Sequence, residues 1–450
     1  MNRENFSSGS SAVNPRKKVK KVKEIKVGII GFGTVGAGVA ENLLNNYNVI
    51  CTRTSTSVKL HKIADLDITS DRGITIPDNV LTTDANEVIN ECDIVVELVG
   101  GTTIAKKFIL QALNSKKHVV TANKALLALH GKELFEAAKA NGVDIFFEAS
   151  VAGGIPIIKA LREGLISNRI NSIYGIMNGT CNYILTRMEN EGVDFDTVLK
   201  DAQKLGYAEA EPSLDVDGFD TAHKTAILSA LAYGEWFGLD NMFVDGIRNI
   251  SLFDMGCAAE LGYRIKLLAI IKNKNGKVEM RVHPTLVHSN GMIGNISDVF
   301  NGVMVDGDTV GNTLFYGRGA GRKATASAVV ADIVDVAKNI AANSIGRTPA
   351  FVEGKLFDSI IPMAEIESSY YLRMMVTDCP GVMAQVSQVF ADGNINIDSL
   401  VQHGEGGGNG VPLVILTGLT REKDMLAAIE KLEKLSCSLD KVRMLRIENI

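Results

Sequence analysis

The segment Ala202–Lys224, AQKLGYAEAEPSLDVDGFDTAHK, carries five carboxylates, Glu209, Glu211, Asp215, Asp217 and Asp220. Carboxylates this dense repel one another on a solvated surface, yet residues 225–231 continue as an apolar helical pattern typical of burial. On that helix, Asp220 and Lys224 stand four residues apart and share one face. An ammonium group among carboxylates stays charged and can deliver a proton, which predicts an acid–base site. The alternative is an acidic loop followed by a surface ion pair.

A glycine-rich turn near the start of the chain has the pattern of a dinucleotide-binding loop. The apolar run Ile25–Phe32 predicts a strand, GFGTVG a turn, and VGAGVAENLLNN a helix. In this pattern Gly31 permits the tight turn, Gly33 lets the backbone approach a pyrophosphate, and Gly36 allows close packing of the helix. The other residues of this expected cofactor loop are Phe32, Thr34 and Val35.

Two later turns are expected to complete the cofactor site. The second strand, Lys59–Asp65, ends in an acid, and an acid at this point binds the ribose 2′-hydroxyl and disfavours a 2′-phosphate. Because Asp65 is an acid, it favours NAD. It comes later in the sequence than the usual spacing, so NADP remains open and Asp65 can also be a plain loop residue. A third strand at Asp93–Val99 is followed by a turn able to approach the cofactor, formed by Gly100, Gly101 and Thr102.

Lys124 opens the helix expected after the strand His118–Thr121. A cation in the first turn opposes the helix dipole, and stability alone would favour an acid there. Lys124 is therefore a site residue or, alternatively, a solvated surface lysine. The next strand is expected at Phe146–Ala149, and the glycine-rich loop SVAGGIPI after it leads into a helix.

The composition fits a soluble globular protein with about three domains. A net charge of −5, with 46% hydrophobic and 22% charged residues, argues against a nucleic-acid binder and a disordered chain. Six scattered cysteines without a C-x-x-C pair argue against a disulfide framework or zinc site and fit a reducing cytoplasm. No apolar run is long enough to span a membrane and no signal core is found, so a cytoplasmic location is expected.

The later part of the chain predicts two further folding units. Segments at Met280–Pro284, Asn301–Val305 and Gly307–Leu314 predict an open mixed sheet covered by helices. The C-terminal residues predict a βαββαβ order, that of a ferredoxin-like unit. Its expected elements are Tyr370–Thr377, Gly381–Asp392, Ile395–His403, Pro412–Thr417, Thr420–Lys434 and Val442–Ile447.

Three motifs give the chain a family resemblance. The acidic segment follows A-x3-G-Y-A-x2-(acid)-P-x2-D-V-x-G-x-D-x3-K, which resembles the signature of homoserine dehydrogenases, although Glu211 stands where the family usually has Asp or Asn. NGTCNYIL at 178–185 resembles a second motif of that family, in which Gly179, Thr180 and Asn182 line the cleft between the domains. TDCPGVMAQVSQVFADGNINI resembles an ACT domain. Residues 25–447 as a whole resemble a monofunctional homoserine dehydrogenase with a C-terminal ACT domain.

The resemblance implies reversible reduction of L-aspartate 4-semialdehyde to L-homoserine with NADP or NAD, in threonine, isoleucine and methionine biosynthesis. Lys224 would be the catalytic acid and base, and Lys124 would lie near the nicotinamide and the reacting carbonyl. Gly206 and Gly321 would contact the cofactor. The residues implied to hold the substrate are Glu209, Asp215, Asp220, Gly179 and Thr180.

The resemblance also implies a cation, an effector and an oligomer. The segment EASVAGGI would wrap Na⁺ or K⁺, and a plain domain hinge is the alternative. The expected cation ligands are Glu148, Val151, Gly153 and Ile155. The ACT domain would bind L-threonine through Asp378, Gly381 and Asn394, or would serve only for dimerisation. A homodimer or homotetramer is expected.

The expected architecture is therefore α/β, with a discontinuous Rossmann-type domain, an α+β substrate and oligomerisation domain with a mixed sheet, and a ferredoxin-like ACT domain. The Rossmann-type domain is expected at 25–150, with a returning helix at 320–350. The substrate and oligomerisation domain is expected at 151–319, and the ACT domain at 368–450. A disordered basic leader is expected at 1–24, for which nucleic-acid binding is the alternative, and a linker at 351–367.

Two other functions remain open at this point. One is a different amino-acid or semialdehyde dehydrogenase on the same fold. An aldehyde-phosphorylating enzyme needs a cysteine nucleophile, and Cys181 is the cysteine within a site motif, but no histidine is near it in the sequence. The other is an amino-acid sensor that has lost catalysis, against which the presence of both Lys124 and Lys224 argues.

Overall fold

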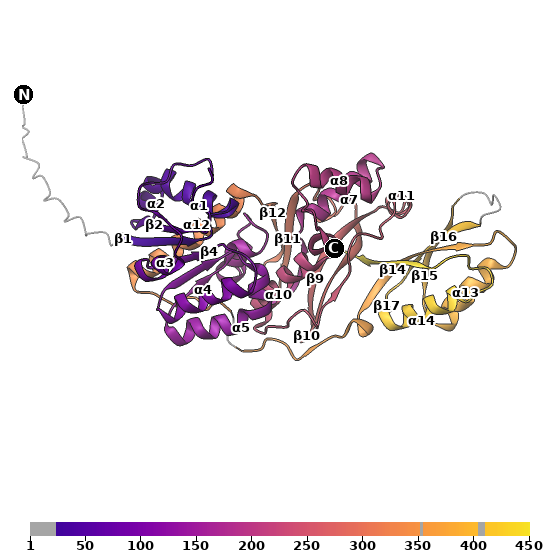
Figure 1. Ribbon diagram of the computed structural model, residues 1–450. Coiled ribbons are helices and arrows are strands. Elements are labelled where there is room, and N and C mark those ends of the chain that lie inside the picture. Colours follow the sequence, from indigo (N-terminus) through magenta and orange to yellow (C-terminus); the bar gives the residue numbers. More distant parts are fainter. Residues whose placement is uncertain (1–23, 352–353, 404–409) are drawn as a thin grey trace, which may run out of the picture.

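The computed structural model describes residues 24–351, 354–403 and 410–450. The expected leader therefore lies outside the described residues, except for Glu24. Figure 1 shows three parts in a row, with the dinucleotide-binding part at one end, a large sheet in the middle and the ACT part at the other end. No helix within the described residues is both long and apolar enough to cross a membrane.

The first part is a parallel six-stranded sheet with the order β3-β2-β1-β4-β5-β6. This is the Rossmann order, which confirms the predicted fold. Its strands are β1 (Glu24–Ile30), β2 (Ser57–Ala64), β3 (Leu81–Thr82), β4 (Ile94–Glu97), β5 (His118–Thr121) and β6 (Ile145–Phe146). Its helices are α1 (Thr34–Asn45), α2 (Tyr47–Thr54), α3 (Ala85–Glu91), α4 (Thr103–Asn114) and α5 (Lys124–Asn141).

A helix from far along the chain, α12 (Arg322–Ala342), completes this part. Its apolar side chains share a buried cluster with those of β1 and α1, and Figure 1 shows α12 beside α1. The two helices approach closely at Gly38, where an added Cβ would lie 2.8 Å from the backbone oxygen of Arg322. The Rossmann domain is therefore discontinuous.

The middle part is a mixed sheet whose strands run in the order β12-β11-β7-β9-β10. They are β7 (Ile170–Ile176), β9 (Tyr263–Lys274), β10 (Lys277–His288), β11 (Phe300–Gly307) and β12 (Gly311–Arg318). β9 was not predicted from the sequence, because its core is apolar on both faces and shows no two-residue alternation. A strand was expected to begin at Gly307. Instead, β11 ends at Gly307, and a loop at Asp308–Val310 separates it from β12.

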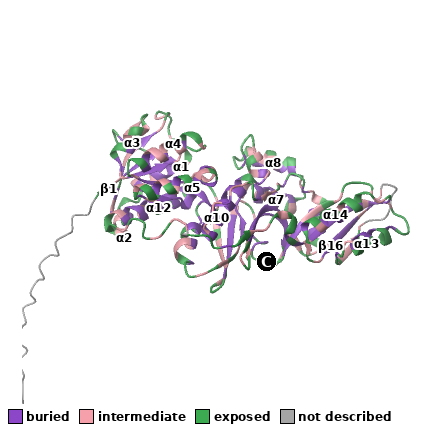
Figure 2. Cartoon of the chain, turned by 90° about the horizontal axis from the view of Figure 1, so that it is seen from below, coloured by how far each residue is buried: buried purple, intermediate pink, exposed green. Residues whose placement is uncertain are grey.

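Helices cover the middle sheet and carry the acidic segment. They are α7 (Gly179–Glu191), α8 (Phe195–Lys204), α9 (Ser213–Val216), α10 (Phe219–Tyr233) and α11 (Leu252–Glu260). The side chains of α10 are buried from Asp220 to Tyr233, as the purple of α10 in Figure 2 shows. The prediction of a buried helix after the acidic run is therefore confirmed, and the ionisable side chains buried with it include Asp220 and Lys224.

The third part has the predicted βαββαβ order. Its elements are β14 (Glu367–Val376), α13 (Val382–Asp392), β15 (Ile397–Gln402), β16 (Val411–Thr417), α14 (Glu422–Glu433) and β18 (Arg443–Glu448), with a short β17 (Thr420–Arg421) before α14. The antiparallel sheet order β18-β14-β16-β15 is that of a ferredoxin-like unit, which confirms the expected ACT architecture.

The ACT sheet continues the middle sheet, which the sequence analysis did not predict. β18 pairs with β10 in parallel, with Thr285 opposite Arg446. The expected linker also contributes a strand, β13 (Ser359–Ile360), which pairs with β10. Behind this junction, Glu448 forms ion pairs with Lys272 and with Arg281, whose side chain is 0% exposed. The ACT sheet is thus continuous with the middle sheet, although the ACT part keeps a hydrophobic cluster of its own.

Candidate active site

A cavity of about 660 Å³ lies where the Rossmann part meets the middle sheet. Two helix starts (α5 and α7), α10, the loop before α9 and the turn between β12 and α12 all contribute to its wall. The sequence-predicted site residues that line it are Val35, Lys124, Gly153, Gly179, Thr180, Gly206, Glu209, Asp215, Asp220, Lys224 and Gly321. Residues predicted from distant motifs therefore come together around one space.

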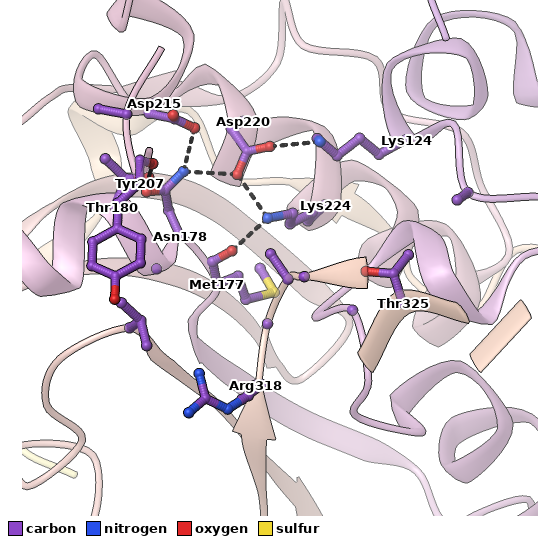
Figure 3. A pocket seen from close by; sticks show the side chains of 18 of the residues that line it. Lys124, Met177, Asn178, Thr180, Tyr207, Asp215, Asp220, Lys224, Arg318 and Thr325 are labelled. Carbon is purple, nitrogen blue, oxygen red and sulfur yellow. Dashed lines mark hydrogen bonds and ion pairs between the residues drawn. The ribbon is translucent and has the colours of Figure 1, made fainter. Parts of the chain in front are cut away.

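Asp220 is the centre of the charged groups in this cavity (Figure 3). Its Oδ2 lies 2.7 Å from Nζ of Lys224, and its Oδ1 lies 3.0 Å from Nζ of Lys124. Burial by itself raises the pKa of Asp220, but the two ammonium groups outweigh burial and hold that pKa well below its usual range. Asp220 in turn raises the pKa of Lys124. The aspartate is therefore a fixed anion that positions two cations.

The position of Lys224 leaves it able to act on a ligand. Its Nζ donates to Asp220 and, at 2.5 Å, to the carbonyl oxygen of Met177. An ammonium group has three donors, so one N–H remains for a group in the cavity. Because Lys224 is only 8% exposed, this donor serves the cavity and not bulk solvent.

Asn178 joins the buried Asp220 to the partly buried Asp215, a role that was not predicted from the sequence. Its Nδ2 donates to Asp215 at 2.7 Å and to Asp220 at 2.8 Å. Its Oδ1 accepts from the backbone N–H of Cys181 and so caps α7. Burial, and then the charge of Asp220, raise the pKa of Asp215. The cap depends on local sequence, but the contact with the acids depends on the tertiary fold.

The other three carboxylates of the acidic segment are exposed or only partly buried. Glu209 is exposed at the rim of the cavity. Glu211 accepts from the backbone N–H of Ser213 at 3.1 Å, and Asp217 pairs with Arg248 at 2.5 Å. Glu211 and Asp217 are therefore structural, and Glu209 remains available to a ligand.

The predicted glycine loop has the geometry of a phosphate cradle. A Cβ on Gly31, whose φ is +105°, would lie 2.6 Å from the backbone of Leu98, and a Cβ on Gly36 would lie 2.0 Å from the oxygen of Gly31. Gly33 faces open space and has no side chain to cap α1, so the first N–H groups of that helix can meet phosphate oxygens. The residues present therefore fit a dinucleotide.

The remaining predicted cofactor residues follow strands at the same edge of the sheet. Phe32 lies in the glycine loop after β1, Thr34 begins α1, Asp65 follows β2, and Thr102 precedes α4. Oδ2 of Asp65 accepts from the backbone N–H of Phe32 at 2.5 Å, so this carboxylate holds the glycine loop. The carboxyl ends of parallel strands are where such ligands bind.

The expected cation loop differs locally from the prediction. Glu148 lies in a 3₁₀ turn (Glu148–Ser150) and not in a strand. Its carboxylate accepts from the backbone N–H groups of Ile158 and Lys159, both at 2.8 Å, at the start of α6 (Ile157–Lys159). Burial raises the pKa of Glu148 to about 7. Val151 and Ile155 are buried beside it, and Gly153 contacts the turn at Gly319.

Two other sequence expectations concern residues outside the cavity. Asn182 was expected to line the cleft, but this side chain is buried and donates to the carbonyl oxygen of Phe300 at 3.1 Å. The expected effector residues are exposed in the ACT part, where Asp378 follows β14, Gly381 precedes α13, and Asn394 follows α13 in a left-handed conformation. Cavity residues that the sequence analysis did not single out include Met177, Asn178, Tyr207, Arg318 and Thr325.

Cys181 does not have the environment of a nucleophile. Its thiol is buried and donates to the carbonyl oxygen of Asp215 at 3.2 Å. Burial raises the pKa of this thiol well above its usual value, and the charges of Asp215 and Asp220 add to the effect. Because the thiolate is the reactive form, this arrangement disfavours the aldehyde-phosphorylating alternative.

Comparisons with known proteins agree with this geometry. A family model described as homoserine dehydrogenase matches residues 156–334, one described as homoserine dehydrogenase, NAD binding domain, matches 31–148, and an ACT domain model matches 370–435. A homoserine dehydrogenase of Neisseria gonorrhoeae is 44% identical over 95% of this chain and 100% of its own length.

Solved structures show the same similarity. The crystal structure of a homoserine dehydrogenase from Thiobacillus denitrificans superposes with a TM-score of 0.89 at 45% identity, covering 95% of this chain and 99% of that chain. A hyperthermophilic archaeal homoserine dehydrogenase in complex with NADPH has a TM-score of 0.60 at 28% identity and covers 70% of this chain and 98% of that chain. With the cavity, its paired lysines and the glycine loop in place, the chain belongs to the homoserine dehydrogenase family.

Proposed function

We propose that this protein reduces L-aspartate 4-semialdehyde to L-homoserine, and catalyses the reverse reaction, with a nicotinamide dinucleotide. The observation that carries the proposal is Asp220 held between Lys124 and Lys224 in a cavity that also receives Val35 of the glycine loop. A bound aldehyde would then have its carbonyl oxygen beside two cations, with the dinucleotide cradle next to them. Such alignment of two bound reactants supplies much of an enzyme's rate.

Each residue has a role in the proposed chemistry. The dinucleotide, when bound, supplies or accepts the hydride. Lys224 gives a proton to the carbonyl oxygen as it becomes a hydroxyl, and takes it back in the reverse direction. Lys124 stabilises the negative charge that develops on this oxygen. Glu209 and Asp215 hold the ammonium group of the amino acid, and Asp220 keeps both lysines in place.

For the dinucleotide itself, we propose a preference for NAD over NADP. The residue at the end of β2 is an acid, Asp65, and the basic residue that follows, Arg72, is paired with Asp67 at 3.0 Å. A 2′-phosphate placed there would meet two carboxylates. We expect kcat/KM to be higher for NADH than for NADPH, and the reverse order would contradict this.

We also propose L-threonine as an effector of the ACT part, held by Asp378, Gly381 and Asn394. Deleting the ACT part is a poor test, because it would remove β18 from β10 and leave Arg281 without Glu448. Asp378→Ala should instead abolish inhibition by threonine at saturating homoserine, while Asp440→Ala, an exposed control, should not. If threonine competes in the active site as an isomer of homoserine, all three proteins will be inhibited equally.

A monovalent cation and an oligomer complete the proposal. A Na⁺ or K⁺ ion would bind the carbonyl oxygens of Val151, Gly153 and Ile155 and share the carboxylate of Glu148 with two backbone N–H groups. Replacing KCl by choline chloride should then lower activity.

A homodimer or homotetramer fits the edge strand β15, because β15 pairs only with β16 within the described chain. Light scattering can measure the mass of the oligomer.

The decisive experiment for the activity follows the NAD(P)H absorbance in three mixtures: the semialdehyde with NAD(P)H, the semialdehyde with phosphate and NAD(P)⁺, and L-homoserine with NAD(P)⁺. L-Aspartate 4-semialdehyde alone should support oxidation of the reduced cofactor. Semialdehyde with phosphate and NAD(P)⁺ should give no reduction of the cofactor, because Cys181 cannot serve as the nucleophile. Absence of any turnover with the semialdehyde, or with L-homoserine in reverse, would contradict the proposal and favour an amino-acid sensor.

A further inference from the structure

Lys124 joins the two parts of the chain that form the active-site cavity. It is the first residue of α5 in the Rossmann part, and its Nζ lies 3.0 Å from Oδ1 of Asp220 on α10 of the middle part. The dashed line between these two side chains in Figure 3 marks this ion pair. Asp220 therefore fixes the charged end of Lys124. A lysine has a flexible four-carbon stem, so the place of the ammonium group also depends on how firmly the backbone at Lys124 is held.

The backbone just before Lys124 is held by a threonine at the end of β5. Oγ1 of Thr121 accepts from the backbone N–H of Asn123 at 3.0 Å. The side chain of Asn123 accepts from the backbone N–H of Leu126 at 3.1 Å and caps α5. Because a cap of this kind stabilises the first turn of a helix, the bond from Thr121 holds the residue on which the position of Lys124 depends.

A buried acid from the neighbouring strand holds this threonine in turn. Oγ1 of Thr121 donates to Oε2 of Glu97 at 2.8 Å, and both residues are 0% exposed. Oε1 of Glu97 accepts from the backbone N–H groups of Val99 and Gly100, at 2.9 Å and 3.2 Å. A buried carboxylate needs such partners, and a threonine is stiff at χ1. The Thr121 hydroxyl is therefore held in one orientation, with its hydrogen on Glu97 and its oxygen on the backbone before α5.

We propose that Thr121, held by Glu97, is a positioning residue for Lys124. This inference rests on the proposed function, in which Lys124 stabilises the negative charge on the reacting oxygen. Thr121 and Glu97 are not among the described residues that line the cavity, so they act on the reaction through the start of α5. A misplacement of about 1 Å at a reacting group can lower a rate about 100-fold. Lys124 thus has two fixed points, Asp220 at its charged end and the threonine network at its backbone.

The test measures hydride transfer in single turnovers, with and without the ammonium group of Lys124. Thr121→Val removes the hydroxyl and keeps the shape of the side chain. It should lower the rate of homoserine oxidation by NAD⁺ about 10- to 100-fold, because Lys124 is then misplaced. Lys124→Met keeps most of the stem and removes the charge. Adding Thr121→Val to Lys124→Met should change the rate less than about 2-fold, because two changes that act through one group are not additive.

Three further measurements separate positioning from a general loss of structure. Thr121→Ser keeps the hydroxyl and should restore most of the rate. Thr417→Val makes the same change at a buried threonine of the ACT part, whose Oγ1 accepts from the backbone N–H of Tyr370 at 3.2 Å, and should leave the rate unchanged. The dissociation constant of NADH, measured by fluorescence, should stay the same in Thr121→Val, because Glu97 still holds the turn after β4.

The outcomes separate this inference from the function on which it rests. An unchanged rate in Thr121→Val, or a loss that is equally large in the Lys124→Met background, would overturn it. Weaker NADH binding in Thr121→Val would also overturn it and assign the threonine to the cofactor turn. If Thr121→Val does not fold, Asn123→Ala takes its place, since loss of a cap costs only about 1 kcal/mol, and the same lack of additivity is expected. If the unaltered protein does not oxidise homoserine at all, the proposed function itself fails.

Discussion

Nζ of Lys224 lies 2.7 Å from Oδ2 of Asp220, one helical turn earlier on α10, and both side chains are buried. An i, i+4 ion pair on an exposed helix contributes little to stability. Here the ion pair lies at the wall of a cavity, and the other carboxylate oxygen of Asp220 pairs with Lys124. The relationship therefore fixes a proton donor in place, which gives the first prediction.

Lys224→Ala should lower kcat by about 10²- to 10⁴-fold, the usual contribution of general acid–base catalysis. The KM for homoserine should change much less, because Glu209 and Asp215 still hold the substrate. Lys204→Ala, which removes an exposed lysine at the end of α8, is the control and should behave like the unaltered enzyme. A kcat that is nearly unchanged in Lys224→Ala would transfer the acid–base role to Lys124.

Glu209→Gln should raise the KM for homoserine by about 10-fold or more, because an amide binds an ammonium group less strongly than a carboxylate does. The affinity for the dinucleotide should stay the same. Glu211→Gln is a matched control, since Glu211 lies two residues away and only caps the turn at Ser213. A parallel loss of dinucleotide affinity in Glu209→Gln would place this residue in the cofactor site.

Asn178→Asp should lower both stability and activity, although it only replaces the side-chain NH₂ group by an oxygen. An aspartate still caps α7, but it cannot donate to Asp215 and Asp220, and it adds a third negative charge between them. Loss of these buried bonds should cost about 1–3 kcal/mol of unfolding free energy, measured by chemical denaturation. Asn178→Ser keeps a cap without the charge and should be milder. Equal stability of Asn178→Asp and the unaltered protein would contradict the bridging role.

Much of the fold could be predicted because its signals are local. The glycine turn after β1 needs residues without side chains, and the order of strands and helices in the Rossmann and ACT parts follows from periodicity and turn residues. β9 was missed because a strand that is buried on both faces lacks alternation. The pairing of β18 with β10 was also missed, because it joins backbone edges and leaves no side-chain pattern.

The site was partly predictable for the same reason. Asp220 and Lys224 share one helix, so their spacing revealed them. Asn178 and Arg318 reach the cavity from segments separated by more than a hundred residues, and no spacing connects them with Lys224. The family resemblance singled out Asp215, which lines the cavity, but spacing alone could not tell it from Asp217, which pairs with Arg248.

Stability should fall as pH rises from about 4.5 to about 7, in part because of Glu148. Burial raises the pKa of this carboxyl from 4.5 to about 7 in the folded protein. The unfolded chain therefore loses this proton at lower pH than the folded chain, so the stabilising contribution is full below pH 4.5 and is lost as pH passes 7. At about 1.4 kcal/mol per pKa unit, the total is about 3 kcal/mol. Glu148→Gln should flatten the pH dependence of the unfolding free energy over this range, and an unchanged slope would contradict the assignment.

The buried ion cluster between the middle sheet and the ACT part gives the last prediction. Glu448 near the chain end pairs with Lys272 at 2.6 Å and with Arg281, and Glu279 lies 3.1 Å from Arg281. Glu448→Ala leaves the buried Arg281 and the partly buried Lys272 with one anion, which should cost about 3–5 kcal/mol.

Calorimetry should show this cost as a lower melting temperature for Glu448→Ala, since the cluster lies where β18 joins β10. The control is Glu430→Ala, which removes an exposed partner of Lys434 on α14 and should have little or no effect. Because Arg281 is 0% exposed, water cannot replace the lost carboxylate without opening the sheet junction. Equal melting temperatures for the two variants would mean that the junction is held by the β10–β18 backbone pairing and not by the ion cluster.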